Sequence, residues 1–230
     1  MFWRHWSQCL ICQRWPTPSV CPTCHPLYAR LLPRCSLCAQ SMQGHGPQCT
    51  ERFSWSQASA RVSYEAPFDG WVKRLKFAGE WTLAREMAQL MRESDDAQML
   101  LEAADWVVPV PVSRERLRER GYSQAAWLAR QWCGRDRRLQ VHWLQKWQHT
   151  TAQARADRAT RCQQLRGTMG LLPESLGRLR GARVLLVDDV MTTGATLEVA
   201  TQCLLAAGVK AVDVAVFART PAALHSQDHV

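Results

Sequence analysis

The sequence predicts an α/β fold, with a parallel sheet flanked by helices, behind a small cysteine-rich N-terminal segment. Four branched apolar residues, Val184–Val187, lead through a hydroxyl-rich turn into a helical pattern and then a second strand. This order of elements builds a parallel sheet. Seven of the ten cysteines fall within the first 49 residues, which sets the N-terminus apart. We therefore expect a cysteine-rich segment at residues 1–55 and an α/β domain at residues 56–230.

Length and charge limit the functional classes. A chain of 230 residues, 47% of them hydrophobic, can form an ordinary domain with a small appendage. It has no apolar run of about 18 residues, and Trp3 to Ser7 interrupt the stretch that a secretory signal needs. We expect a cytoplasmic protein without membrane insertion. The net charge of +9 favours a polyanionic partner, although a basic surface without a specific partner gives the same charge.

The N-terminal cysteines have the spacing of metal ligands. They form three C-x-x-C pairs and one further residue: Cys9/Cys12, Cys21/Cys24, Cys35/Cys38 and Cys49. Two residues between thiolates allow a tight turn to aim both sulfurs at one Zn²⁺ ion. In a reducing compartment this spacing favours zinc over disulfides, the alternative being buried or redox-active thiols without metal. The first two pairs predict one structural zinc site. The third pair is either completed by Cys49 and His45 to a second site of three thiolates and one imidazole, or it is degenerate and empty.

The middle of the chain supplies elements in α/β order. Residues 54–60 are polar and predict a linker, and residues 61–64 alternate like a strand. Helical spacing follows at residues 71–77 and 83–92, and residues 105–111 form a short apolar strand that ends in prolines.

A very basic stretch follows that strand. Residues 114–120 carry four arginines and are predicted as a loop, followed by Gly121 and a helical pattern through Leu128. Strand, basic loop and helix in this order place the loop at the carboxyl edge of the sheet. Several tryptophans come next: Trp127, Trp132, Trp143 and Trp147. We expect them in the core, the alternative being surfaces on which nucleic-acid bases stack.

The turn after the apolar run has the chemistry of a sugar-phosphate site. Asp188 and Asp189 end the strand, and a loop with three threonines leads into a helix that begins after Gly194. Unpaired amides and the dipole at a helix start bind anions. Carboxylates accept hydrogen bonds from vicinal hydroxyls or hold a divalent cation. A phosphate next to a diol describes a ribose 5-phosphate, the alternative being a Rossmann-like turn in which the carboxylates cap the helix.

The segment Val184–Thr196, VLLVDDVMTTGAT, resembles the phosphoribosyl pyrophosphate (PRPP) motif of type I phosphoribosyltransferases. The whole chain resembles the ComF/GntX family, which joins a zinc-binding segment to such a domain. Further similar pieces are KFAG at residues 76–79, VPVP at residues 108–111 and the arginine-rich stretch before Gly121 and Tyr122. The resemblance implies the type I phosphoribosyltransferase fold.

The resemblance also implies residue roles. The catalytic candidates are Lys76, which would approach the pyrophosphate, and Asp188 and Asp189, which would take the ribose hydroxyls with Mg²⁺. Arg118 and Arg120 would meet the same pyrophosphate or a nucleic acid. The loop that would bind the 5-phosphate comprises Met191, Thr192, Thr193, Gly194, Ala195 and Thr196.

Two functional classes follow from the resemblance. One is a PRPP-dependent phosphoribosyltransferase that displaces pyrophosphate at the anomeric carbon. The other is a non-catalytic module that binds PRPP or single-stranded DNA and serves DNA uptake, as in natural transformation, or DNA utilisation. A third reading makes the zinc segment a docking module for a protein partner such as a DNA-uptake helicase. The sequence departs from the family pattern at Ser123 and in the expected hood loop, where Gln164 stands in place of an Asn after Thr150, Gln153 and Arg161. These departures bear on the acceptor chemistry rather than on PRPP binding.

Overall fold

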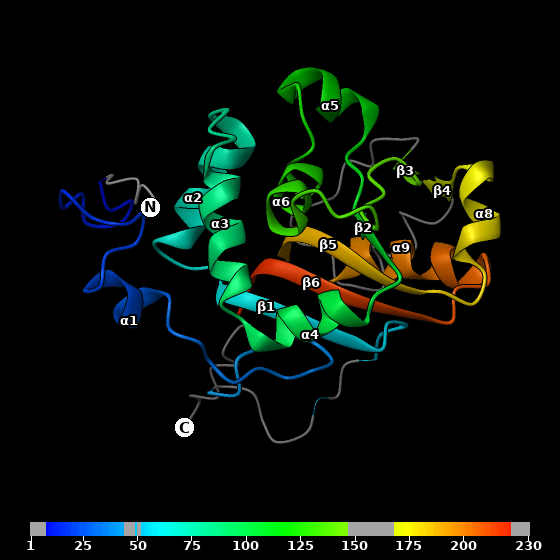
Figure 1. Ribbon diagram of the computed structural model, residues 1–230, viewed down its shortest axis with the longest axis horizontal. Helices are drawn as coiled ribbons and strands as arrows, with labels where there is room; N and C mark the ends of the chain where they lie inside the picture. Colours follow the sequence, from blue (N-terminus) through cyan, green and yellow to red (C-terminus); the bar gives the residue numbers. More distant parts are fainter. Residues whose placement is uncertain (1–7, 44–48, 50–51, 147–167, 222–230) are drawn as a thin grey trace, which may run out of the picture.

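The computed structural model describes residues 8–43, 49, 52–146 and 168–221. Its centre is a parallel sheet with the strand order β1-β6-β5-β2 (Figure 1). The strands of this sheet are β1 (Gln57–Ser63), β2 (Trp106–Pro109), β5 (Arg183–Met191) and β6 (Ala211–Arg219). A separate antiparallel pair joins β3 (Leu144–Lys146) to β4 (Met169–Leu171).

Helices cover both faces of the sheet. The described helices are α1 (Cys24–Tyr28), α2 (Phe68–Phe77), α3 (Leu83–Arg92), α4 (Asp95–Ala103), α5 (Arg114–Arg120), α6 (Gln124–Cys133), α8 (Pro173–Leu179) and α9 (Ala195–Ala206). Helices α2, α3, α4 and α6 share one buried cluster with the sheet, whereas α9 packs in the cluster on the other face. Helix α1 belongs to the N-terminal segment and lies to one side of the sheet, and the chain that follows it runs beneath β1 (Figure 1).

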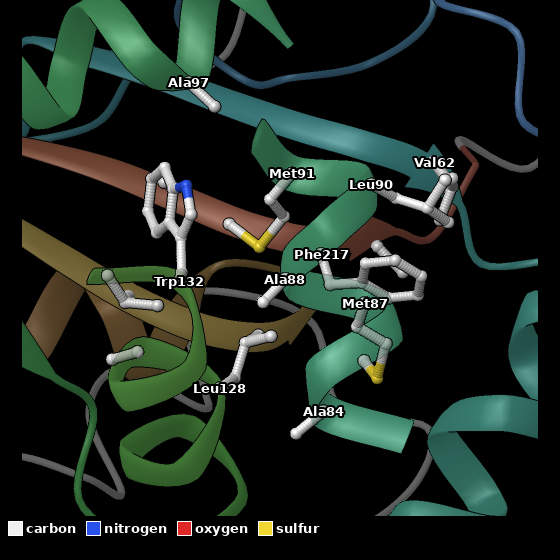
Figure 2. Close-up of a cluster of buried hydrophobic side chains, with 14 of the residues drawn as sticks. Val62, Ala84, Met87, Ala88, Leu90, Met91, Ala97, Leu128, Trp132 and Phe217 are labelled. Atoms are coloured by element: carbon white, nitrogen blue, oxygen red, sulfur yellow. The ribbon is translucent and has the colours of Figure 1, made fainter. Parts of the chain in front are cut away.

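The alternation of side chains along β5 explains the two layers. Leu185 and Val187 belong to one buried cluster, and Val184 and Leu186 belong to the other. A parallel strand covered on both faces needs apolar residues at successive positions, as the sequence predicted. Figure 2 shows the first cluster, where Met91 of α3 and Trp132 of α6 lie over the sheet. None of the helices in the described part of the chain combines the length and the apolar character that a membrane crossing needs.

The predicted linker at residues 54–60 is wrong. Residues 57–60 are the first half of β1, which pairs with β6, and Trp55 just before it is only 3% exposed. The small side chains of Ala58 and Ala60 pack in the cluster that contains α9. Alternating small residues have a low hydropathy signal, so the sequence pattern underestimated this strand.

The predicted basic loop at residues 114–120 is a helix. Ser113 caps α5 by accepting a hydrogen bond from the amide of Arg116, and Gly121 ends the helix with a φ of 77°. No residue of α5 is buried, and the helix lies beyond α6 at the top of the view in Figure 1. Arginine and glutamate favour helix formation, so a charged solvated helix fits the same composition as a loop.

The prediction that the tryptophans belong to the core is confirmed for two of them. Trp132 and Trp143 are buried. Trp127 is only partly buried, and Trp147 lies outside the described residues.

Candidate functional site

A pocket of about 300 Å³ opens at the carboxyl edge of the parallel sheet. Ligands of open α/β sheets bind at this edge, and the volume is at the lower end for small-molecule sites. The pocket is lined by Tyr64, Lys76, Val110, Pro111, Val112, Ser113, Arg116, Arg120, Gln124, Ala125, Lys146, Asp188, Asp189, Val190, Thr192 and Thr196. These residues come from the ends of β1, β2, β3 and β5 and from helices α2, α5, α6 and α9.

An ion pair joins the two predicted catalytic regions. The Nζ atom of Lys76 lies 3.0 Å from Oδ1 of Asp189. Lys76 follows Leu75 on α2, and the side chain of Leu75 is fully buried. The Tyr122 hydroxyl donates a hydrogen bond to the Leu75 carbonyl oxygen. The packing of α2 therefore fixes the backbone from which Lys76 reaches the pocket.

Burial and the neighbouring charges set the charge state of Asp188. Burial, followed by the charge of Asp189, raises the pKa of Asp188, and the charge of Lys76 only partly offsets both. Burial by itself would lower the pKa of Lys76, but the charges of Asp189 and Asp188 outweigh it, so that this pKa is raised. Lys76 is therefore a cation, and Asp188 needs further positive charge nearby to be fully ionised.

The Oδ2 atom of Asp189 is a buried polar atom whose hydrogen-bonding capacity is left for a ligand. Asp189 is 4% exposed, and this oxygen is buried with no hydrogen-bond partner among the described residues. A buried carboxylate oxygen without a partner costs free energy unless a cation or a donor reaches it. A hard divalent cation or a sugar hydroxyl fits this place.

The loop predicted to bind phosphate wraps the start of α9. Gly194, at the N-cap of α9, has a φ of 76°, a conformation that favours glycine. Thr192 and Thr196 line the pocket, whereas Met191 is buried beneath the loop. Thr193, Gly194 and Ala195 complete the turn without lining the pocket, and the Thr193 hydroxyl accepts from the Ala195 amide at 3.4 Å.

Cationic side chains face the carboxylates across the pocket. Arg116 and Arg120 are four residues apart on α5 and both line the pocket, together with Lys146 at the end of β3. Arg118, which was predicted for the site, is exposed and does not line it. With the stretch recognised as a helix, the i and i+4 spacing would have grouped Arg116 with Arg120 and Arg114 with Arg118, and only the tertiary structure shows that the first pair faces the pocket.

Gln124 is a lining residue to which the sequence assigned no role. It is 2% exposed at the start of α6, and its Nε2 atom has no hydrogen-bond partner within the described residues. An amide nitrogen in this state can donate to a ligand oxygen in the pocket. The residues expected in a hood loop, Thr150, Gln153, Arg161 and Gln164, lie outside the described part of the chain.

The first cysteine cluster has the geometry of a metal site. The sulfurs of Cys9, Cys12, Cys21 and Cys24 all lie within 4.8 Å of one another, with 3.7 Å between those of Cys12 and Cys21. A tetrahedron with Zn–S bonds of about 2.3 Å has edges of about 3.8 Å. Backbone amides point at the sulfurs, as the Cys24 amide does at 3.4 Å from Cys21 Sγ, and lower the pKa of Cys21. These four thiols could therefore bind zinc.

The second cysteine cluster offers three sulfurs. Those of Cys35, Cys38 and Cys49 also lie within 4.8 Å of one another. Burial raises the pKa of Cys38, and its neighbours Cys49 and Cys35 add to the shift. His45, the imidazole considered as a fourth ligand, lies outside the described residues.

Comparison with known proteins finds a domain match and several relatives. A phosphoribosyl transferase domain model matches residues 140–230. Competence protein F of Haemophilus influenzae is 28% identical over 193 residues, which cover 79% of this chain and 82% of that protein. Competence protein ComFC of Bacillus subtilis is 26% identical and covers 88% of this chain and 84% of its own length. The chain is similar to competence proteins of the ComF type and contains a match to the phosphoribosyl transferase domain.

A further relative extends the match along the chain. The DNA utilization protein YhgH of Escherichia coli K12 is 27% identical, covering 94% of this chain and 92% of its own. Among solved structures, an allosteric regulatory enzyme of purine biosynthesis shares 25% identity over 58% of this chain and 25% of its own, with a TM-score of 0.36 that supports no conclusion. The predicted fold class is confirmed: a parallel sheet flanked by helices that matches a phosphoribosyltransferase domain, with an N-terminal cysteine cluster consistent with zinc.

Proposed function

We propose that this protein binds PRPP together with Mg²⁺ in the pocket at the carboxyl edge of the sheet. The observation that carries the proposal is the meeting of Asp189, whose Oδ2 atom is buried without a partner, with Thr192 and Thr196 in one pocket. Carboxylates suit a diol and a divalent cation, and the threonines stand at the start of a helix where phosphate binds.

The balance of charge supports a polyphosphate ligand. Four cationic side chains, Lys76, Arg116, Arg120 and Lys146, face two carboxylates in this pocket. Asp188 and Asp189 would hold Mg²⁺, which would neutralise negative charge on the ligand. Lys76 would hold the pyrophosphate from α2, and Arg116 and Arg120 would hold it from α5. If an acceptor attacks the anomeric carbon, the same groups stabilise the pyrophosphate as it leaves.

Titration calorimetry with PRPP, with and without Mg²⁺, tests the proposal. We expect a dissociation constant on the order of micromolar with Mg²⁺, and affinity at least about tenfold weaker without it. Ribose 5-phosphate is the matched ligand, because it lacks the pyrophosphate and should bind more weakly. A folded, zinc-loaded sample that binds neither compound would overturn the proposal.

The relatives point to the process in which this pocket works. Two are competence proteins and one is a DNA utilization protein. We infer that this protein also serves DNA uptake or DNA utilisation. The net charge of +9 agrees with a nucleic-acid partner.

An aromatic surface beside the pocket favours direct binding of single-stranded DNA as a second function. We name it the aromatic surface and define it as Phe77, Trp81 and Trp127. Phe77 is 75% exposed, and the Arg120 guanidinium lies 5.0 Å from its ring centroid. Trp81 is 53% exposed and packs edge-on against Trp127. Exposed rings next to arginines are the elements on which successive bases stack.

A labelled oligothymidine titration tests this second function. The variant Phe77→Ala/Trp81→Ala should lose about 1–3 kcal/mol of binding per base that stacks. Trp15→Ala is the matched control, since Trp15 is 62% exposed but belongs to the N-terminal segment. Affinity should also fall as salt rises, in proportion to the phosphates neutralised. Equal affinity of both variants and the wild type would exclude the aromatic surface.

A further inference from the structure

The second cysteine cluster is attached directly to the loop proposed to bind phosphate. Arg219, the last residue of β6, is 6% exposed. Its Nε atom donates to the Cys38 carbonyl oxygen at 2.8 Å, and its Nη1 atom donates to the Met191 carbonyl oxygen at 3.1 Å and also to that of Thr192. A single rigid guanidinium therefore ties a cysteine of the cluster to the beginning of the loop.

Aromatic rings make a second connection. Phe53 and Trp55 stack with 3.9 Å between ring centroids. A Cβ placed on Gly194 would lie 2.9 Å from Trp55 and 3.0 Å from Phe53, so both rings press against the turn of the loop. The Trp55 indole donates a 2.8 Å hydrogen bond to the Leu37 carbonyl oxygen, between Cys35 and Cys38.

Further hydrogen bonds hold the same segment against the sheet. The Ala58 amide of β1 donates to the Ser36 carbonyl oxygen at 2.7 Å. The Gln40 side chain donates to the Thr220 carbonyl oxygen at 2.9 Å, and the Thr220 amide in turn donates to the Met191 carbonyl oxygen at 3.0 Å. The turn around Cys38 thus lies under the loop as a support.

The first cysteine cluster contacts a different part of the molecule, the region around α3. His25, next to Cys24, contacts the Glu93 carboxylate at 2.9 Å, beyond the end of α3. Leu10, Ile11 and Val20 pack against the cluster that contains α3. Loss of structure in the first cluster would disturb this outer contact and leave the support under the loop in place.

We propose that the second cysteine cluster, through Arg219 and Trp55, positions the phosphate loop, so that PRPP affinity depends on a metal ion at Cys35, Cys38 and Cys49. The first cluster has no such effect. The inference deepens the proposed function and rests on it. Its physical basis is that a metal-bound turn holds the Cys38 and Leu37 carbonyl oxygens in fixed positions. Without the metal, these carbonyl oxygens are no longer held in place. Arg219 and Trp55 then lose the hydrogen-bond acceptors through which they position the loop.

Matched pairs of cysteine variants test the inference. Cys35→Ser/Cys38→Ser should release metal from the second cluster and lower PRPP affinity at least about tenfold. Cys9→Ser/Cys12→Ser should release metal from the first cluster and change PRPP affinity less than about threefold. Metal content is measured by native mass spectrometry and affinity by calorimetry. Equal PRPP affinity of the two variants, with each metal lost, would overturn the inference.

Arg219→Lys separates positioning from simple loss of structure. Lysine keeps the charge but lacks the planar guanidinium, whose separate Nε and Nη1 atoms reach the Cys38 and Met191 carbonyl oxygens. Metal content should stay that of the wild type, while PRPP affinity falls by about three- to tenfold. Unchanged affinity with the metal retained would show that Arg219 does not position the loop.

Amide hydrogen exchange distinguishes failure of the inference from failure of the proposed function. Exchange at residues 191–196 should accelerate in Cys35→Ser/Cys38→Ser and in Arg219→Lys, but not in Cys9→Ser/Cys12→Ser. This readout needs no PRPP. If wild-type protein binds no PRPP but shows this exchange pattern, the function is wrong and the coupling stands. If it binds PRPP and the loop exchanges alike in all variants, the coupling is wrong.

Discussion

Asp188→Asn/Asp189→Asn is expected to lose Mg²⁺-dependent PRPP affinity by a factor of at least about 100, or about 2.7 kcal/mol. Both carboxylates line the pocket, and Asp189 carries the oxygen that is buried without a described partner. An amide removes the charge that holds a divalent cation and leaves the shape nearly unchanged. Calorimetry with and without Mg²⁺ measures the effect. A loss of less than about threefold would show that the diol and cation site lies elsewhere.

The stability of the same variant is the control for folding. The pKa of Asp188 is higher in the folded chain than in the unfolded chain, because of burial and the charge of Asp189. The unfolded chain then releases its proton first as the pH rises above about 4, so this residue's contribution to stability is lost as the pH rises through the folded pKa. Urea titrations should show wild-type stability falling with pH relative to the double variant. The variant should therefore remain folded at pH 8.

Gly194→Ala is expected to lower both stability and PRPP affinity. The positive φ of Gly194 costs an alanine about 1–2 kcal/mol. The new Cβ would also overlap the rings of Trp55 and Phe53, and overpacking of this kind costs about 1–3 kcal/mol more. Because the turn must shift to admit the methyl group, PRPP affinity should fall at least about tenfold. Urea unfolding and calorimetry measure the two effects.

Gly181→Ala separates backbone strain from the contact with the rings. Gly181 has a φ of 75°, nearly that of Gly194, but a Cβ there would meet nothing within 4 Å. It precedes β5 at the amino ends of the strands, whereas the pocket lies at their carboxyl ends. This variant should lose only the strain energy of about 1–2 kcal/mol and keep PRPP affinity. If both alanine variants behaved alike, the aromatic rings would have no role at the loop.

Structural elements and sites whose residues lie close together in the sequence could be predicted. The segment from β5 through α9 to β6 carries its apolar run, its glycine and its helical pattern within about 35 residues. The first cysteine cluster is equally local, because each C-x-x-C turn sets its own geometry. The carboxylates and loop threonines of the candidate site came from this same information.

Other parts of the fold were misread for local reasons. The first half of β1 has small side chains that give little hydropathy signal, and α5 has none that are buried. Arg116, Lys146 and Gln124 reach the pocket from three separate elements. The periodicity of one element cannot indicate which residues of other elements it will meet.

The sequence by itself determined the parallel sheet, the phosphoribosyltransferase-like loop and the cysteine pairs, because each depends on spacing along the chain. Only the tertiary structure decided that Lys76 pairs with Asp189, that Arg116 rather than Arg118 faces the pocket, and that Arg219 joins the second cysteine cluster to the loop. These contacts link residues that are distant in sequence. Their geometry follows from the packing of all layers together, which fixes where each side chain ends and which buried polar atoms meet.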